Sequence, residues 1–205
     1  MRKSVALAYV AIMACTLTLL LAGVGLPEYS HRLHPIGLRG AAGLPGAWLF
    51  NVGAFVLPGL CLALVAQWLR MAQQGTRWGL RLGLTLAQLS ALAFALQGAL
   101  PLDAQDLDAG PSRLHALAWA LWWIAFVPGA LLLSLYARRG FGFAAACLAA
   151  AVLLPLFGVL APLDGWVGFE QRLALALWFC WWLLAARSLS DISTSTPESS
   201  PPTGK

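Results

Sequence analysis

The sequence predicts an all-α fold, a six-helix transmembrane bundle made of three helical hairpins with outward-facing loops and both termini cytoplasmic. Three observations predict it. The 205 residues are 60% hydrophobic and only 10% charged, whereas soluble domains average about 25% charged residues. Six apolar stretches each approach the ~20 residues that cross the hydrocarbon core of a bilayer. Basic and acidic residues also separate onto alternate loops.

Each apolar stretch is expected to be a helix, because backbone polar groups in hydrocarbon must pair within their own segment and barrel-type alternation is absent. The first stretch is expected to stay as an uncleaved helix, since its apolar run continues well past Cys15. The Ser/Thr/Pro-rich segment 188–205 has too few apolar residues to order itself, which predicts a disordered cytoplasmic tail after a membrane domain of residues 1–187. The expected helices are about 5–26, 47–68, 80–101, 114–136, 143–161 and 170–187.

The charges predict the orientation, because Lys and Arg concentrate in short cytoplasmic loops. With the N-terminus inside, the inner face holds Arg2, Lys3, Arg70, Arg77, Arg81, Arg138, Arg139, Arg187 and Lys205, and the outer face holds Arg32, Arg39, Arg113 and Arg172. Most carboxylates go outside: Glu28, Asp103, Asp106, Asp108, Asp164 and Glu170. We therefore expect a multi-pass protein of a bacterial inner membrane, with the lipid bilayer as its partner. The net charge of +5 is then a topology signal and gives no reason to expect nucleic acid.

A repeated phrase points to the outer end of the bundle. "ALPLD" at 99–103 and "LAPLD" at 160–164 are each followed by an Arg-Leu pair and a tryptophan cluster. Aligning Arg113 with Arg172 places Trp119, Trp122 and Trp123 opposite Trp178, Trp181 and Trp182. This register favours hairpins arranged as parallel repeats about an axis along the membrane normal. Chance recurrence of Leu, Ala and Trp in an apolar chain is the alternative.

The phrase also has a structural interpretation. Proline ends a helix, and an Asp just past it bonds nearby backbone and turns the chain. The Arg that opens the return helix is within reach of that Asp. Asp103 with Arg113, and Asp164 with Arg172, are therefore expected to clamp the two turns.

Polar side chains gather at the same end, where intramembrane polar groups are functional candidates by default. Asn51, Gln97, Asp103, Ser112 and His115 form the expected rim of a site. Asp103 and His115 would be the catalytic base and its orienter if the site were enzymatic. The "HRLH" spacing at 31–34 is compatible with a metal, but no HExxH or HxxxH motif accompanies it, so no metal site is assigned.

Three functions stay open. The first is a non-enzymatic protein that binds a lipid-like or small hydrophobic ligand in an outward-facing, tryptophan-lined cavity. The second is an intramembrane hydrolase or transferase that acts on a lipid headgroup through Asp103 and His115. The third is a structural subunit with a membrane-protein partner. No cofactor is identified. The ligand-binding candidates are Asn51, Gln97, Ser112, Arg113, Asp164, Arg172, Trp119 and Trp122.

Several short motifs resemble the DUF998 family of bacterial and archaeal membrane proteins. They are Ser30 with the Gly- and Pro-rich run after it, "FNVGAFVLPG" at 50–59, "PLD" at 101–103, and "SRLH" at 112–115. The resemblance spans roughly residues 5–187. It implies a six-helix integral membrane fold and carries over no activity. A more distant similarity to zinc-dependent membrane hydrolases of the ceramidase group is weakened by the lack of His in the sixth predicted helix.

Overall fold

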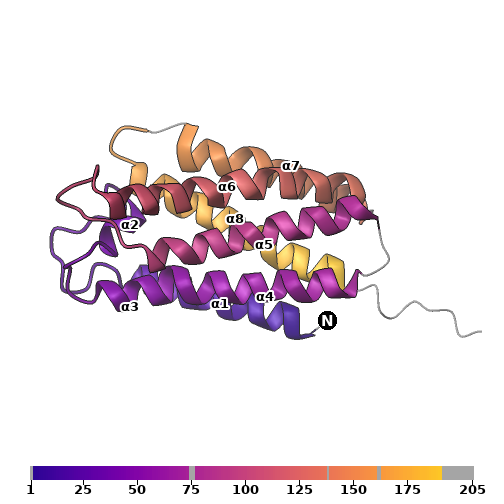
Figure 1. Ribbon diagram of the computed structural model, residues 1–205, viewed down its shortest axis with the longest axis horizontal. Helices are drawn as coiled ribbons and strands as arrows, with labels where there is room; N and C mark the ends of the chain where they lie inside the picture. The colour runs from indigo at the N-terminus through magenta and orange to yellow at the C-terminus, as the bar shows by residue number, and fades with distance from the viewer. Residues whose placement is uncertain (1, 74–76, 138, 161–162, 191–205) are drawn as a thin grey trace, which may run out of the picture.

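The computed structural model describes residues 2–73, 77–137, 139–160 and 163–190. Within these residues the chain is all-helical, and six helices are long and apolar enough to cross a membrane. The helices run side by side, and the start of the first and the end of the last lie at the same end of the bundle (Figure 1). The predicted tail falls mostly on residues 191–205, which lie outside the described residues.

The helix bounds match the predicted spans to within four residues, except that α1 ends at Leu20, six residues before the predicted end of the first helix at Leu26. The elements are α1 (Arg2–Leu20), α2 (Ile36–Arg39), α3 (Ala47–Asn51), the π-helical segment η1 (Val52–Val56), α4 (Leu57–Ala72), α5 (Trp78–Ala99), α6 (Gly110–Tyr136), α7 (Phe141–Pro155), the π-helical segment η2 (Leu156–Leu160) and α8 (Val167–Ser190). The second predicted span is α3, η1 and α4 in continuous succession, and the fifth is α7 with η2.

Prolines mark both departures from α-helical geometry. A proline inside a helix removes one N–H donor and clashes with the preceding turn. Pro58 follows η1 by two residues, and Pro155 ends α7 directly before η2. A π-helical turn is rare, and here each one adjoins a position where the α-helical hydrogen-bond pattern is interrupted. Pro128 differs, because α6 continues as an α-helix on both sides of it.

Small residues allow α5 to approach its neighbours closely. Gly79, Gly83, Ala87, Ala91 and Ala95 are spaced four apart and all buried, so they form a stripe that winds gradually around the helix, from the α6 side at Gly83 to the α4 side at Ala91. A Cβ at Gly59 of α4 would come within 2.7 Å of the Ala91 carbonyl oxygen. On the α6 side, a Cβ at Gly83 would lie 3.1 Å from the carbonyl oxygen of Gly129. This is the close packing of small residues that joins membrane helices.

The helices form a closed ring in chain order. Each of α1, α4, α5, α6, α7 and α8 packs against the next, and α8 returns to pack against α1. The packing therefore does not divide the bundle into three separate hairpins, because α4 packs against α5 and α6 against α7 as well. The closing contact between α1 and α8 joins the helices furthest apart in the sequence.

An aromatic cluster fills the ring. It contains Phe94, Trp122, Phe126, Trp178, Trp181 and Trp182, all buried. The Phe94 ring centroid lies 4.8 Å from that of Trp178, and the Trp122 centroid lies 5.5 Å from the same ring. Both copies of the repeated tryptophan motif thus contribute to one core.

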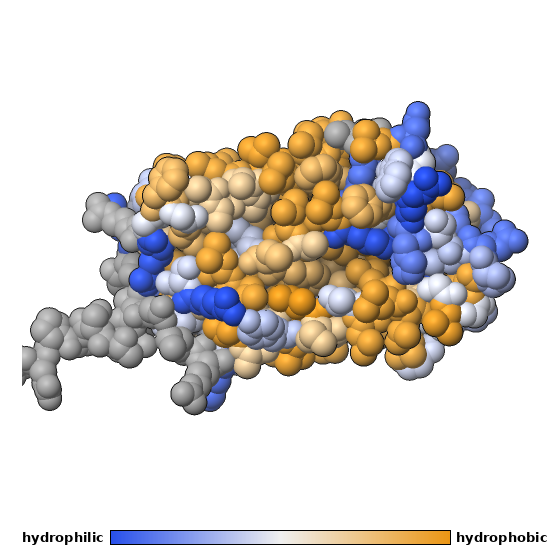
Figure 2. Space-filling view, turned by 180° about the vertical axis from the view of Figure 1, so that it is seen from behind, coloured by the Kyte–Doolittle hydropathy of each residue, from blue (hydrophilic) through white to orange (hydrophobic). Residues whose placement is uncertain are grey.

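The outside of the bundle suits a lipid environment. Large apolar side chains are exposed along its length, for example Leu17, Leu64 and Leu135. Figure 2 shows a broad hydrophobic middle, with hydrophilic residues gathered at the end that carries the loop after α1. We call this end the loop end.

Candidate functional site

The loop that follows α1 lies directly on the first turn of α8. The Phe169 N–H donates to the Arg32 carbonyl oxygen over 3.2 Å. At Gly168 an added Cβ would overlap the carbonyl oxygen of His34, so only a glycine lets the two backbones approach this closely. The contact fixes residues 31–34 beside α8, although they are more than 130 positions away in the sequence.

Arg172, one turn further along α8, is held by neutral groups alone. Its Nη1 donates to the carbonyl oxygens of Gly168 and His34, over 2.5 and 3.3 Å. Its Nη2 donates to the Tyr29 hydroxyl over 2.5 Å. The buried Nε has no hydrogen-bond partner among the described residues. The loop and α8 thus share a guanidinium whose charge no carboxylate in the described part of the chain neutralises.

His31 stands beside this guanidinium. Its ring meets the Tyr29 ring edge-on at a centroid distance of 5.2 Å. Partial burial lowers the pKa of His31, and the positive charge of Arg172 lowers it further. The imidazole is therefore neutral at pH 7 and gains a positive charge only in acid. Burial raises the pKa of the Tyr29 phenol, which keeps that hydroxyl protonated.

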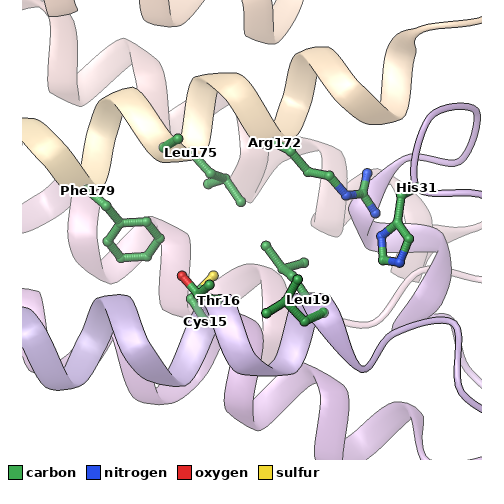
Figure 3. Close-up of a pocket in the computed structure, with 9 residues that line it drawn as sticks. Cys15, Thr16, Leu19, His31, Arg172, Leu175 and Phe179 are labelled. Carbon is green, nitrogen blue, oxygen red and sulfur yellow. The ribbon is translucent and has the colours of Figure 1, made fainter.

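Below these two side chains a groove runs along the seam between α1 and α8. Its volume is about 320 Å³. Figure 3 shows Arg172 and His31 at one end and Cys15, Thr16 and Phe179 toward the other. The lining residues are Cys15, Thr16, Leu19 and Leu20 of α1, His31 of the loop, and Arg172, Leu175, Ala176 and Phe179 of α8. The groove is an apolar channel with one cationic end.

A second pocket of about 290 Å³ lies within the loop end. Glu28, Tyr29, His34 and Arg39 line it together with aliphatic side chains. The Arg39 guanidinium is buried, and its Nε donates to the Ala22 carbonyl oxygen over 2.8 Å. Arg39 thereby ties the segment after α1 to the chain before α3. Tyr29 connects this pocket to the groove between α1 and α8. It lines the pocket, and its hydroxyl accepts the hydrogen bond from Arg172, which lines the groove.

The predicted Asp–Arg clamps do not form. Asp103 closes the turn through backbone bonds: its Oδ1 accepts from the Gln105 N–H, and its own N–H donates to Ser112 Oγ, both over 2.9 Å. Arg113 is exposed and makes no polar contact within the described residues. The Ser112 hydroxyl, and not Arg113, holds the turn closed, because it lies within hydrogen-bond distance of the Asp103 and Asp106 carbonyl oxygens.

Asp164 is likewise exposed and unpaired within the described part of the chain. Arg172 turns away from it toward the loop after α1, as described above. The two aligned arginines of the repeat therefore have different surroundings, and only Arg172 lines a cavity among the pockets described here.

Asp103 and His115 do not form the predicted base and orienter. The buried His115 places its Nδ1 3.0 Å from the Gln97 carbonyl oxygen and 2.9 Å from that of Leu100, so Nδ1 carries the proton. The imidazole joins α6 to the last turn of α5. The Gln97 amide is fully buried, and neither of its polar atoms has a partner in the described residues.

The other predicted residues named below make contacts within the bundle. Asn51 is buried, and its Nδ2 donates to the Gly40 carbonyl oxygen over 2.8 Å, which joins the end of α3 to the end of α2. Trp122 is fully buried in the aromatic cluster, and the half-buried Trp119 packs on it at a centroid distance of 5.0 Å. Neither described pocket is lined by a tryptophan. The predicted tryptophan-lined cavity is instead a packed core in this region.

Metal-ligating side chains do not cluster in the described residues, where no group of three His, Cys, Asp or Glu gathers. His31 and His34 both pack their rings against Tyr29. His34 Nδ1 accepts a hydrogen bond from the Ser30 N–H over 3.0 Å, which closes the loop.

Arg172 was among the residues predicted from the sequence, but the α1 wall of the groove and Tyr29 were not. Cys15, Leu19 and Leu20 read as ordinary residues of an apolar helix. The available signal was that Arg172, Tyr29 and the two histidines of the loop all fall at the same end of the predicted bundle. Only the closure of the ring between α1 and α8 brings them together.

Comparison of the chain with protein-family models, curated proteins and solved structures finds no match. The resemblance to the DUF998 family therefore stays a prediction from short motifs.

The environment of His31 makes a prediction about its titration. Replacing Arg172→Gln removes one of the two causes that lower the His31 pKa, so this pKa is expected to rise, while burial keeps it below the usual value of about 6.5. Histidine NMR titration in detergent micelles, assigned with His31→Gln, measures the change. Arg113→Gln removes an exposed arginine of the same end and is expected to leave the His31 pKa unchanged. A wild-type pKa at or above the usual value contradicts the described contact.

Proposed function

We propose that this integral membrane protein binds a lipid-like ligand, with a hydrocarbon chain lying in the groove between α1 and α8. The observation that carries the proposal is the form of the groove: about 320 Å³ of apolar channel at the depth of the membrane-spanning helices, with Arg172 and His31 at one end only. A lipid has the same division into a long apolar part and a compact polar part.

The shape of the groove favours a bound lipid chain at this position. Lipid tails are as apolar as Leu, so burial of apolar area gives no advantage over the bilayer, and the gain comes from van der Waals contacts with a fixed surface. Two side walls of such a surface are present, from Leu19 and Leu20 on α1 and from Leu175 and Phe179 on α8. A groove at a helix seam orders a chain that would otherwise be mobile.

The other two predicted functions gain no comparable support. The catalytic alternative needed Asp103 and His115 together, and each is engaged by backbone groups instead. The structural-subunit alternative predicts a partner protein on the lipid-facing surface, which would make any lipid in the groove incidental. The binding experiment below therefore separates it from the proposed function.

The orientation of the protein is part of the proposal. Lys3, Arg70, Arg77, Arg81 and Arg187 lie near the end opposite the loops, where α1 and α5 begin and α4 and α8 end. We place that end in the cytoplasm and the loop end in the periplasm of a bacterium, consistent with the retention of basic residues inside.

The orientation predicts which end an aqueous reagent reaches. In intact cells a membrane-impermeant maleimide is expected to label Gln105→Cys in the α5–α6 loop. Phe141→Cys, at an 89% exposed position at the other end, is expected to react only after lysis. The reverse pattern would show that the molecule is inverted and that the groove opens toward the cytoplasmic side.

If a lipid chain lies in the groove, a large side chain that fills the groove is expected to reduce lipid binding. Ala176→Trp places a large ring in the groove from an exposed position of α8. In native mass spectrometry after mild delipidation, the fraction of protein that retains a phospholipid is expected to fall at least about fivefold, because the chain loses its wall contacts. Ala149→Trp, on the exposed face of α7, is the matched control and is expected to retain lipid as the wild type does. Equal phospholipid retention by Ala176→Trp and Ala149→Trp would contradict the proposed function.

A further inference from the structure

Arg172 is an uncompensated cation at the edge of the membrane. A guanidinium has five N–H donors, and three of them serve the carbonyl oxygens of Gly168 and His34 and the Tyr29 hydroxyl. One Nη2 donor and the Nε donor remain. A partly buried charge held only by neutral dipoles is less stable than one that meets an opposite charge.

The nearby carboxylates do not supply that charge. Glu170 is two residues from Arg172 on α8, which places it on the far side of the helix. Its Oε1 accepts a hydrogen bond from the Leu163 N–H over 3.1 Å. Asp164 is exposed and makes no contact in the described residues. The groups that do face the guanidinium are the neutral Tyr29 hydroxyl and the neutral His31 ring.

The position of Arg172 in the groove limits the kind of anion. Phe179 lies seven positions further along α8, a rise of ~10 Å along the helix. Over this length the lining is Leu, Ala, Cys, Thr and Phe. A ligand that fills the groove therefore carries its negative charge at one end of an apolar chain. A free anion would leave the rest of the groove without contacts.

The geometry points to an anionic phospholipid as the occupant, with its phosphate on Arg172. This inference rests on the proposed function and specifies the headgroup. Guanidinium N–H groups match phosphate oxygens and form charge-assisted hydrogen bonds, which are about twice as strong as neutral ones. His31 lies beside the phosphate position and adds a second positive charge in acid. Zwitterionic lipids bring a compensating ammonium group that finds no carboxylate among the residues lining this groove.

The test measures headgroup preference separately from chain binding. The full-length protein is reconstituted in nanodiscs that contain equal parts of phosphatidylglycerol and phosphatidylcholine with identical acyl chains. After extraction, native mass spectrometry counts which lipid is retained. The wild type is expected to retain phosphatidylglycerol over phosphatidylcholine by at least about tenfold, the range of one charge-assisted hydrogen bond.

Variants assign the preference to Arg172. Arg172→Gln is expected to abolish the preference while total lipid retention stays near the wild-type level. Arg113→Gln removes the aligned arginine of the repeat, an exposed residue at the same end, and is expected to keep the full preference. Arg172→Lys retains the positive charge but lacks the planar set of N–H donors of a guanidinium, so it is expected to keep a reduced preference for phosphatidylglycerol. This variant serves as the readout if Arg172→Gln does not fold.

The outcomes separate this inference from the proposed function. Retained lipid without headgroup preference in the wild type overturns the anionic headgroup and leaves chain binding intact. Loss of preference in Arg113→Gln equal to that in Arg172→Gln assigns the effect to surface charge and overturns the inference. Displacement of the lipid by millimolar glycerol 3-phosphate would show that the site takes a soluble phosphate in place of a lipid. Absence of any retained lipid contradicts the proposed function itself.

Discussion

The close approach of α5 to α4 and α6 is the contact on which the rest of the structure depends. Small residues every fourth position bring the three backbones together, and there is no hydrophobic driving force in lipid to replace that contact. With α4, α5 and α6 fixed, the aromatic cluster fills the space toward α8, and the chain order brings α8 back to α1. At the last seam of the ring, between α1 and α8, a groove remains.

The six spans were predictable because the solvent dictates them. Hydrocarbon requires long apolar helices, so run length alone gave every bound to within four residues except the end of α1, which lies six residues before the prediction. The local departures from α-helical geometry were harder to predict from the sequence. Pro58 and Pro155 indicated that a helix is disrupted, but the sequence does not show that a π-helical turn adjoins each of them, whereas α6 continues through Pro128. The start of α6 at Gly110, earlier than the predicted 114, lies in a polar turn that run length cannot locate.

The site was less predictable, because it depends on contacts between distant segments. Arg113 and Arg172 occupy equivalent positions in the repeated motif, and a pattern cannot tell them apart. They differ because Gly168 admits the loop after α1 to the first turn of α8, which surrounds Arg172 with carbonyl oxygens and Tyr29. The sequence led to the prediction that tryptophans line a cavity, because composition cannot distinguish side chains that line a cavity from side chains that fill a core. In the structure their rings fill the space against one another.

The central claim is that the α1–α8 seam is a lipid site whose polar end is Arg172. An experimental structure of the protein in a nanodisc that contains an anionic phospholipid tests it most directly. The account predicts an elongated density between Leu19 of α1 and Leu175 of α8, ending in a headgroup within hydrogen-bond distance of the Arg172 guanidinium. Direct packing of α1 on α8 that leaves no room for a chain, or an acidic side chain on Arg172 where the phosphate should lie, would contradict it.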